Sequence, residues 1–318
     1  MRVLLVSSTS LGLKALERIK KNRKVDVVGI ITANKNFSIS YAPGGVNNVL
    51  HADFSTFSKR HGIPVWKMNE RMTEPGLFDF VQECAPESVL VVGWYHMIPK
   101  RWLEIWPTFG VHASLLPKYT GGAPLVWAIL NGESETGVTL FKFDQGVDSG
   151  PIVDQRKVLI SRKDTISTLY GKIQKATIEM LNAKIGLLSD PDLVLQVQNE
   201  KNRTTFRQRN PDDGVIDSKL SERELRDFVR AQTSPYPGAF IQIGDHRVVV
   251  WRLKSGGLRA FDSENPLVVH RKSVFVAAIN GYLEVAEFSI QQQDEAKWIH
   301  QKMSRKDSLL LIAAKLLP

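Results

Sequence analysis

The sequence has a single cysteine, Cys84, among 318 residues, which excludes an internal disulfide and is typical of a reducing, cytoplasmic setting. It has no CxxC pair and no His/Cys cluster, so no structural zinc site is expected. No apolar stretch reaches the length of about 18 residues that suggests a membrane-spanning helix. The start, MRVLLVSSTSLG, lacks the apolar core and cleavage site of a signal peptide and predicts a buried strand followed by a turn. We therefore expect a cytoplasmic protein with no metal.

Several motifs of common enzyme mechanisms are also missing. There is no GxSxG motif and no cysteine next to a histidine, so covalent nucleophilic catalysis has little support. There is no GxxxxGK[ST] loop, and no GxGxxG follows the first apolar run. Nucleotide phosphate loops of these two kinds are therefore not expected.

The residues that are present give a net charge of +9 and a pI of about 9.5. Such a balance suits an anionic partner, such as a nucleic acid, a phosphorylated small molecule or an acidic membrane surface. Many proteins without such a partner are also basic, and no dense block of lysine and arginine stands out. Charge alone leaves both interpretations open.

Residues 1 to 190 alternate short apolar runs with amphipathic stretches. This alternation predicts an α/β fold with an open, mostly parallel, Rossmann-like sheet whose ligands bind at its carboxyl edge. The expected strands are 3–8, 25–32, 86–94, 136–144 and 150–160, and the expected helices are 13–21 and 165–188. The segment 34–57 has little regular pattern, so it is either a functional loop or a surface insertion.

The composition changes over residues 199–215, which are polar and charged, and we place a linker there. Beyond it, the apolar runs 240–253 and 273–290 predict two hairpins that turn at Gly-Asp and Asn-Gly. Short strands with tight turns predict a smaller, β-rich domain similar to an OB fold or barrel. The expected domains are therefore a catalytic domain, 1–200, and a C-terminal domain, 206–318.

His112 follows an apolar run, where a strand of an α/β sheet would end, and Asp148 lies in a turn between two later strands. Side chains at neighbouring strand ends can face each other across one cleft edge, so Asp148 would orient the His112 ring. Such a pair suits proton transfer and the stabilisation of a developing oxyanion. A histidine beside a loop is also a common structural residue, so the residues alone leave both interpretations open.

The stretch HASLLPKYTGGAP, residues 112–124, is followed by NGESETGVTLFKFDQGVDSGPIV, residues 131–153. Together they contain His-x-Ser-Leu-Leu-Pro, a glycine-rich loop, Thr-Gly-Val-Thr and Asp-x-Gly. This pattern resembles the N10-formyltetrahydrofolate-dependent formyltransferases. Farther along, NPDDGVID (210–217) and SPYPGAF (234–240) are similar to the start of the C-terminal domain in two branches of that family.

One branch formylates initiator methionyl-tRNA, and the other formylates the amine of nucleotide-linked amino sugars. The stretches SLLPKY and WAILNGESETGVTL look closer to the sugar branch. The resemblance implies a formyl transfer from N10-formyltetrahydrofolate to a primary amine, without a metal. It makes the acceptor a nucleotide-linked deoxyamino sugar, with methionyl-tRNA as the alternative.

The resemblance also implies roles for residues of this sequence. His112 would stabilise the oxyanion and move protons, and Asp148 would orient His112 or take the proton of the amine. The folate would lie in a cleft bounded by residues 92–98 and 143–148, where binding relies largely on backbone groups. The residues implied at the folate are Trp94, Tyr95, Met97, Leu116, Asp144, Gly146 and Val147. Those implied at the acceptor are Ser114, Pro117, Lys118, Tyr119 and Gly121.

The sequence departs from the family at Gly110, where the resemblance places a catalytic asparagine two residues before His112. Losing one oxyanion donor costs about 2.7–4 kcal/mol of transition-state stabilisation. Another group or a water would donate instead, or the protein is slow and mainly binds ligands, or the chain is a variant of an asparagine-containing parent. If the missing donor limits the reaction, Gly110→Asn would raise turnover about a hundredfold.

Three functions therefore stay open: a sugar-nucleotide N-formyltransferase, a methionyl-tRNA formyltransferase, and a folate- or nucleotide-binding protein with little catalysis. A hydrolase that releases formate to water is a fourth and weaker option. The sequence leaves the oligomeric state open.

Overall fold

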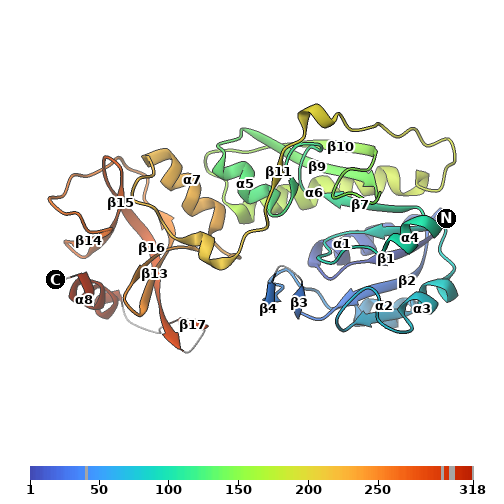
Figure 1. Ribbon diagram of the computed structural model, residues 1–318, viewed down its shortest axis with the longest axis horizontal. Helices are drawn as coiled ribbons and strands as arrows, with labels where there is room; N and C mark the ends of the chain where they lie inside the picture. The colour runs from blue at the N-terminus through green and yellow to red at the C-terminus, as the bar shows by residue number, and fades with distance from the viewer. Residues whose placement is uncertain (40–41, 295–296, 301–304, 317–318) are drawn as a thin grey trace. The chain divides into compact units, whose positions relative to one another are not determined.

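The computed structural model describes residues 1–39, 42–294, 297–300 and 305–316 (Figure 1). Contacts divide the chain into two compact units. Unit 1 comprises Met1–Pro124, Glu135–Leu159 and Gly171–Phe206, and unit 2 comprises Leu125–Ser134, Ile160–Tyr170 and Arg207–Pro318. Two short stretches that precede residue 171 thus group with the C-terminal part. The domain boundaries at 1–200 and 206–318 stay a prediction.

Unit 1 is built on a seven-stranded sheet with the order β10-β9-β7-β6-β1-β2-β5. Neighbouring strands from β7 to β5 run parallel, and β9 and β10 are antiparallel additions at one edge. The mostly parallel sheet predicted from the apolar runs is therefore confirmed. Its strands are β1 (Arg2–Val6), β2 (Asp26–Ala33), β5 (Val65–Met68), β6 (Ser88–Val91), β7 (Thr108–His112), β9 (Glu135–Lys142) and β10 (Ile152–Leu159).

Helices alternate with these strands, because apolar residues recur three to four positions apart between the apolar runs. Thr9 caps the first helix by accepting a hydrogen bond from the Gly12 amide, and the helix buries Leu16 and Ile19. The helices of this part of the chain are α1 (Ser10–Ile19), α2 (Ser55–His61), α3 (Leu77–Cys84), α4 (Lys100–Ile105), α5 (Pro124–Leu130) and α6 (Ile166–Lys184). Within the described ranges, no helix combines the length and the apolar character needed to cross a membrane.

The central strands are buried on both faces, as their near-continuous apolar sequence predicts. Leu4 and Val6 of β1 and Val89 and Val91 of β6 belong to one core cluster, which also contains Trp102 of α4. A rigid, packed sheet centre is the base from which the loops at the strand ends project.

The segment 34–57 contains regular structure, contrary to the expectation from its sequence. β3 (Asn36–Ile39) and β4 (Ala42–Asn47) form a two-stranded antiparallel hairpin. The sequence signal was weak because the strands are short and β4 contains two glycines, Gly44 and Gly45.

Asn48, directly after this hairpin, ties it to the rest of unit 1. Its side chain is buried and donates to the backbone and side-chain oxygens of Ser8, both at 3.3 Å. Its Oδ1 accepts from the amide of Leu50 at 3.0 Å and from the hydroxyl of Tyr95 at 3.3 Å. The hairpin is therefore anchored at the carboxyl end of β1 and beside the segment that follows β6.

The C-terminal part of unit 2 is an antiparallel β-rich structure, as predicted. Its sheet has the order β12-β13-β16-β15-β14, and β17 pairs with β16. The two predicted hairpins form where expected, with Gly244 and Gly281 at positive φ in the turns. The strands are β12 (Ala239–Ile243), β13 (His246–Leu253), β14 (Leu267–His270), β15 (Ser273–Ala278), β16 (Gly281–Asp294) and β17 (Lys297–His300).

Two helices accompany this sheet. α7 (Glu222–Gln232) begins at a capping box in which Ser221 and Glu224 bond each other's backbone amides. α7 buries Leu225 and Val229, which belong to the same core cluster as residues of the sheet. α8 (Arg305–Leu316) packs on the same sheet, and its Ile312 lies in that cluster.

Candidate active site

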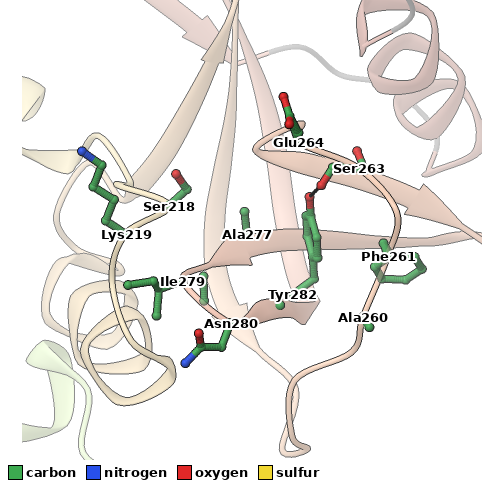
Figure 2. A pocket seen from close by; sticks show the side chains of 12 residues that line it. Ser218, Lys219, Ala260, Phe261, Ser263, Glu264, Ala277, Ile279, Asn280 and Tyr282 are labelled. Carbon is green, nitrogen blue, oxygen red and sulfur yellow. Dashed lines mark hydrogen bonds between the residues drawn. The ribbon is translucent and has the colours of Figure 1, made fainter.

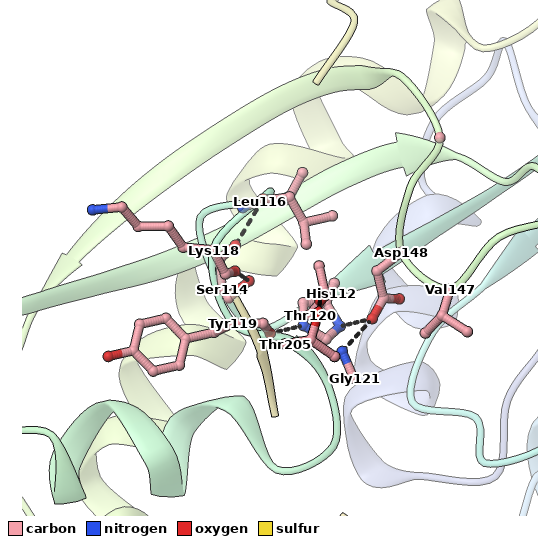
Figure 3. A network of polar contacts seen from close by, with 12 residues as sticks. His112, Ser114, Leu116, Lys118, Tyr119, Thr120, Gly121, Val147, Asp148 and Thr205 are labelled. Carbon is pink, nitrogen blue, oxygen red and sulfur yellow. Dashed lines mark hydrogen bonds and ion pairs between the residues drawn. The ribbon is translucent and has the colours of Figure 1, made fainter. Parts of the chain in front are cut away.

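His112 is the last residue of β7, at the carboxyl end of the strand, and it faces Asp148 from the turn between β9 and β10 (Figure 3). The His112 Nδ1 lies 3.5 Å from the Asp148 Oδ2, and the two side chains are 12% and 18% exposed. The His112 Nε2 lies 2.8 Å from the backbone oxygen of Tyr119. The structure thus brings the two predicted catalytic residues together at the sheet edge where ligands of α/β folds bind.

The hydrogen-bond partners of the His112 ring indicate which of its nitrogen atoms carries a hydrogen. A carbonyl oxygen only accepts, so Nε2 of His112 carries the hydrogen that it donates to Tyr119. The carboxylate of Asp148 also only accepts, so a hydrogen on Nδ1 would face an acceptor 3.5 Å away. The pair can therefore hold a proton between a fixed imidazole and a carboxylate at a partly exposed position, which suits general acid–base chemistry.

The backbone of Asp148 is held in an unusual conformation. Its φ is 53°, in the left-handed region that aspartate and asparagine tolerate better than most residues. The Asp148 Oδ2 accepts a 2.8 Å bond from the amide of Gly121, and Gln198 Nε2 donates to the carbonyls of Asp148 (2.9 Å) and Gly150 (2.7 Å). These bonds fix the direction in which the carboxylate points.

The loop that follows His112 is fixed by Thr139 in β9. The buried hydroxyl of Thr139 donates to the Ser114 carbonyl at 2.7 Å and accepts from the Leu116 amide at 3.1 Å. Gln155 of β10 donates to the same hydroxyl and to the Leu116 carbonyl, both at 2.9 Å. Thr139 of the Thr-Gly-Val-Thr motif therefore holds the His-x-Ser-Leu-Leu-Pro loop in place.

Replacing Thr139 by valine is expected to lower the free energy of unfolding by about 1–3 kcal/mol, because two buried backbone groups of the loop lose their partner. Urea denaturation followed by circular dichroism measures this change. Thr136→Val, the same exchange at another buried position of β9, is the matched control and is expected to cost less than about 1 kcal/mol. Equal losses at the two positions would contradict the assigned role of Thr139.

The residues predicted at the acceptor differ in how far they are exposed to solvent. Lys118 is exposed, and Tyr119 lies with its ring stacked on Phe206 at 4.8 Å between centroids and 8° between planes. Ser114 is buried, and its hydroxyl donates to the Lys118 carbonyl at 2.6 Å, so it supports the loop from inside. Pro117 is half-buried, and its carbonyl accepts from the Thr204 amide at 3.2 Å.

The residues predicted at the folate also differ in their exposure to solvent. Met97 and Val147 expose 68% and 55% of their surface on the two segments expected to bound the cleft. Leu116 is instead 3% exposed and packs in a small core cluster with Phe141 and Ile152. The structure therefore presents Met97 and Val147 to solvent and does not present Leu116.

The segment after β6 contains two polar groups that lack a partner. Trp94 Nε1 and His96 Nε2 are buried without a hydrogen-bond partner, and the two rings lie 5.4 Å apart. Burial lowers the pKa of His96, so its ring is neutral at pH 7. Phe37 of the β3–β4 hairpin packs against His96 and Tyr95 at 5.0 and 5.4 Å. A flat heterocycle with polar edges is a suitable ligand for such a segment.

Asp144 and Gly146 shape the turn that ends at Asp148. The Asp144 Oδ1 accepts from the Gly146 amide at 3.0 Å and from the Ser149 hydroxyl at 2.6 Å. Arg203 donates to the Val147 carbonyl at 3.4 Å and pairs with Glu200. The hydrogen bond that Arg203 donates to the Glu200 carboxylate raises the pKa of Arg203, and the carboxylates of Asp148 and Asp144 add to this shift.

Sequence reasoning missed the contribution of residues 198–206. These residues were assigned mainly to a linker, but Gln198 and Arg203 bond the Asp148 turn, and β11 (Thr205–Phe206) pairs with β8 (Thr120–Gly121). Two 3₁₀ turns also lie in the expected linker, at Glu200–Asn202 and Pro211–Gly214, and another, Ile185–Leu187, directly follows α6. The polar composition gave no sign of this role, because these bonds go to backbone groups far away in the sequence.

A separate pocket of about 500 Å³ lies in unit 2 (Figure 2). It is lined by Phe261 and Tyr282 together with the turn at Asn280, and the Tyr282 hydroxyl donates to the Ser263 carbonyl at 2.6 Å. None of its lining residues is a predicted site residue. Among the described residues, no three histidine, cysteine, aspartate or glutamate side chains are grouped as metal ligands would be.

Comparison with known proteins agrees with this geometry. The profile of the family described as Formyl transferase matches residues 1–185, and that of the Formyl transferase C-terminal domain matches residues 209–300. The first match covers more than half of the 318-residue chain and includes both His112 and Asp148.

Solved structures share the fold at low sequence identity. A methionyl-tRNA formyltransferase from Clostridium thermocellum is 20% identical with a TM-score of 0.54, over 80% of this chain and 94% of its own. WlaRD, a sugar 3N-formyl transferase solved with dTDP and 5-N-formyl-THF, is 19% identical with a TM-score of 0.63, over 91% and 97%.

HypX from Aquifex aeolicus in complex with tetrahydrofolic acid is 16% identical with a TM-score of 0.63. The match covers 95% of this chain but 46% of HypX, so the chain spans about half the length of that relative.

Proposed function

The chain belongs to the formyl transferase family, and on that premise we propose that it transfers a formyl group from N10-formyltetrahydrofolate to a primary amine. The observation that carries this proposal is the His112–Asp148 pair at the carboxyl edge of the sheet. The alignment of one imidazole, one carboxylate and a backbone carbonyl gives the ring a defined orientation, which general acid–base catalysis requires.

In this reaction the nitrogen of the neutral amine forms a bond to the formyl carbon, and the bond from that carbon to N10 breaks. The amine loses a proton and N10 gains one. His112 stabilises the negative charge that develops on the formyl oxygen and moves a proton. This role requires Nε2 to exchange the Tyr119 carbonyl for the substrate, because Nδ1 faces Asp148. Asp148 orients His112 through Nδ1 and stabilises its charge, while Gly121 and Gln198 keep the carboxylate in place.

The described residues fit a folate co-substrate. Met97 and Val147 offer exposed apolar surface to a flat ring. Trp94 and His96, in the same segment as Met97, hold two buried polar atoms without a partner, which a ligand would reach only if these side chains move. Most ligand sites combine an apolar lining with a few polar groups in this way. We therefore assign the folate to the side of His112 formed by residues 92–98 and 143–148.

We assign the acceptor to the nucleotide-linked deoxyamino sugars. The basis is the sequence SLLPKY and WAILNGESETGVTL, together with the exposed Lys118, whose ammonium group suits a phosphate. The net charge of +9 favours methionyl-tRNA as the second candidate, since tRNA is a polyanion. Formyl transfer from N10-formyltetrahydrofolate to a panel of amino-sugar nucleotides and to methionyl-tRNA tests both.

The response to salt is expected to separate the two acceptor classes. If the acceptor is a sugar nucleotide, raising monovalent salt from 50 to 200 mM raises its KM by about threefold, because a diphosphate has few charges. A tRNA held by six or more phosphate contacts would lose about 10³-fold in affinity over the same range. A steep salt dependence with methionyl-tRNA, and no transfer to any sugar nucleotide, would overturn the sugar assignment.

A further inference from the structure

The structure gives a steric reason for the glycine at position 110. A Cβ atom placed on Gly110 would lie 2.2 Å from Cε1 and 2.4 Å from Cζ of the Phe143 ring. Carbon atoms that are not bonded to each other do not approach so closely. The ring of Phe143 therefore occupies the space in which any larger side chain at position 110 would begin.

The register of two strands holds the ring there. Gly110 of β7 is paired with Phe141 of β9, and the Phe143 amide donates to the Thr108 carbonyl at 2.8 Å. Phe143 thus continues the β7–β9 pairing by one residue beyond Lys142, and its ring reaches diagonally across to Gly110. It packs on Phe141 at 4.9 Å between centroids, and it also packs against the small cluster that contains Leu116.

The ring also lies on the face of the strand that carries the candidate active site. Residues two apart in a strand point to the same face, so positions 110 and 112 share the face of β7 from which His112 reaches Asp148. Phe143 is half-buried and packs against two core clusters. An apolar ring therefore stands beside His112 where the resemblance places a hydrogen-bonding amide.

We propose that Phe143 is a positioning residue of the formyl site, which fills the place of the asparagine amide and keeps water from the formyl carbon. This inference rests on the proposed function. Gly110 and Phe143 act as a matched pair: the ring requires a glycine beneath it, and His112 stabilises the oxyanion without an amide from position 110. Gly110→Asn alone therefore does not restore a donor.

The reaction that the Phe143 ring is proposed to prevent is hydrolysis of the formyl group by water. In hydrolysis, the oxygen of a water bonds to the formyl carbon, the bond from that carbon to N10 breaks, and N10 takes a proton, which yields formate and tetrahydrofolate. An asparagine amide would occupy this space with a polar group, whereas Phe143 excludes water from it without offering a hydrogen bond. Removing the ring while keeping Gly110 leaves room for water beside His112.

The test compares the parent protein with Gly110→Asn, Phe143→Ala and the double variant, and uses Phe57→Ala in α2 as a matched control. Each protein is measured for its melting temperature, for formyl transfer to the accepted amine, and for formate release from N10-formyltetrahydrofolate without amine. We expect Gly110→Asn alone to lower Tm by about 5 °C and to gain no turnover. When Gly110→Asn is introduced into Phe143→Ala, it is expected to lower Tm by about 1 °C or less.

Phe143→Ala is expected to raise the ratio of formate release to formyl transfer about tenfold, mainly through kcat, with little change in KM for the folate. The double variant is expected to transfer formyl about tenfold faster than Phe143→Ala, because the amide then has room to donate. Additive changes in Tm, or an unchanged ratio of hydrolysis to transfer in Phe143→Ala, would overturn the proposal.

Failure of the proposed function gives a different result. If none of the four proteins consumes N10-formyltetrahydrofolate with or without any amine, formyl transfer and the role of Phe143 in it are both overturned. The melting temperatures then still decide whether Phe143 and residue 110 compete for one space.

Discussion

His112→Ala is expected to lower kcat for formyl transfer by about 10³-fold, with KM for the folate changed by less than about threefold. The imidazole lies between the Tyr119 carbonyl and the Asp148 carboxylate, and no other ring is held in this way at the end of β7 in the described residues. Its removal takes away both the proton carrier and the stabilisation of the oxyanion. Steady-state kinetics with N10-formyltetrahydrofolate and the accepted amine measure the loss.

Two further variants test whether the loss of activity in His112→Ala comes from the missing imidazole. His112→Gln can donate a hydrogen bond to the Tyr119 carbonyl but cannot carry a proton, so it is expected to be nearly as slow as His112→Ala. His61→Ala, at the exposed end of α2, is the matched control and is expected to keep full activity. If His112→Ala kept more than about a tenth of the parent kcat, the assignment of the catalytic site would be wrong.

Asp148→Asn is expected to lower kcat by about 10²–10³-fold and to leave the fold intact. Asparagine tolerates the left-handed φ of 53° at this position as well as aspartate does, so the backbone of the turn is retained. The exchange removes the charge that faces His112 Nδ1, and the remaining amide oxygen can still accept from the Gly121 amide. The variant therefore isolates the role of the carboxylate from that of the turn.

A comparison with Gln198→Ala separates charge from positioning. That change removes the two bonds that hold the Asp148 and Gly150 carbonyls but keeps the carboxylate, so we expect a smaller loss of about tenfold in kcat. Asp190→Asn, in an exposed turn, serves as the control for loss of an acidic group. Asp148→Asn with near-parental kcat would show that the carboxylate does not assist His112.

The two predictions bear on the unusual residue at position 110. If the Phe143 ring takes the place of the expected amide, as proposed, we expect His112 and Asp148 to carry more of the transition-state stabilisation than in a site with an asparagine. Their removal should therefore leave little residual activity.

The sequence alone determined several central strands of the sheet and the two hairpins of the C-terminal part, but not the short elements such as β3, β4, β8 and β11. The apolar runs that became β1, β2 and β6 are nearly continuous because both faces of a central parallel strand are buried. The Asn280-Gly281 turn formed a hairpin because glycine adopts positive φ without a steric cost. The position of His112 at a strand end also followed from the sequence, since the apolar run stops there.

Only the tertiary structure decided how the site is assembled. The direction of the Asp148 carboxylate depends on Gln198 and Gly121, which are 50 and 27 residues away in the sequence. The overlap between Gly110 and Phe143 depends on the register of β7 on β9, which no local pattern specifies. A sequence states which side chain is absent at position 110, but the pairing of the strands decides which other side chain fills its space.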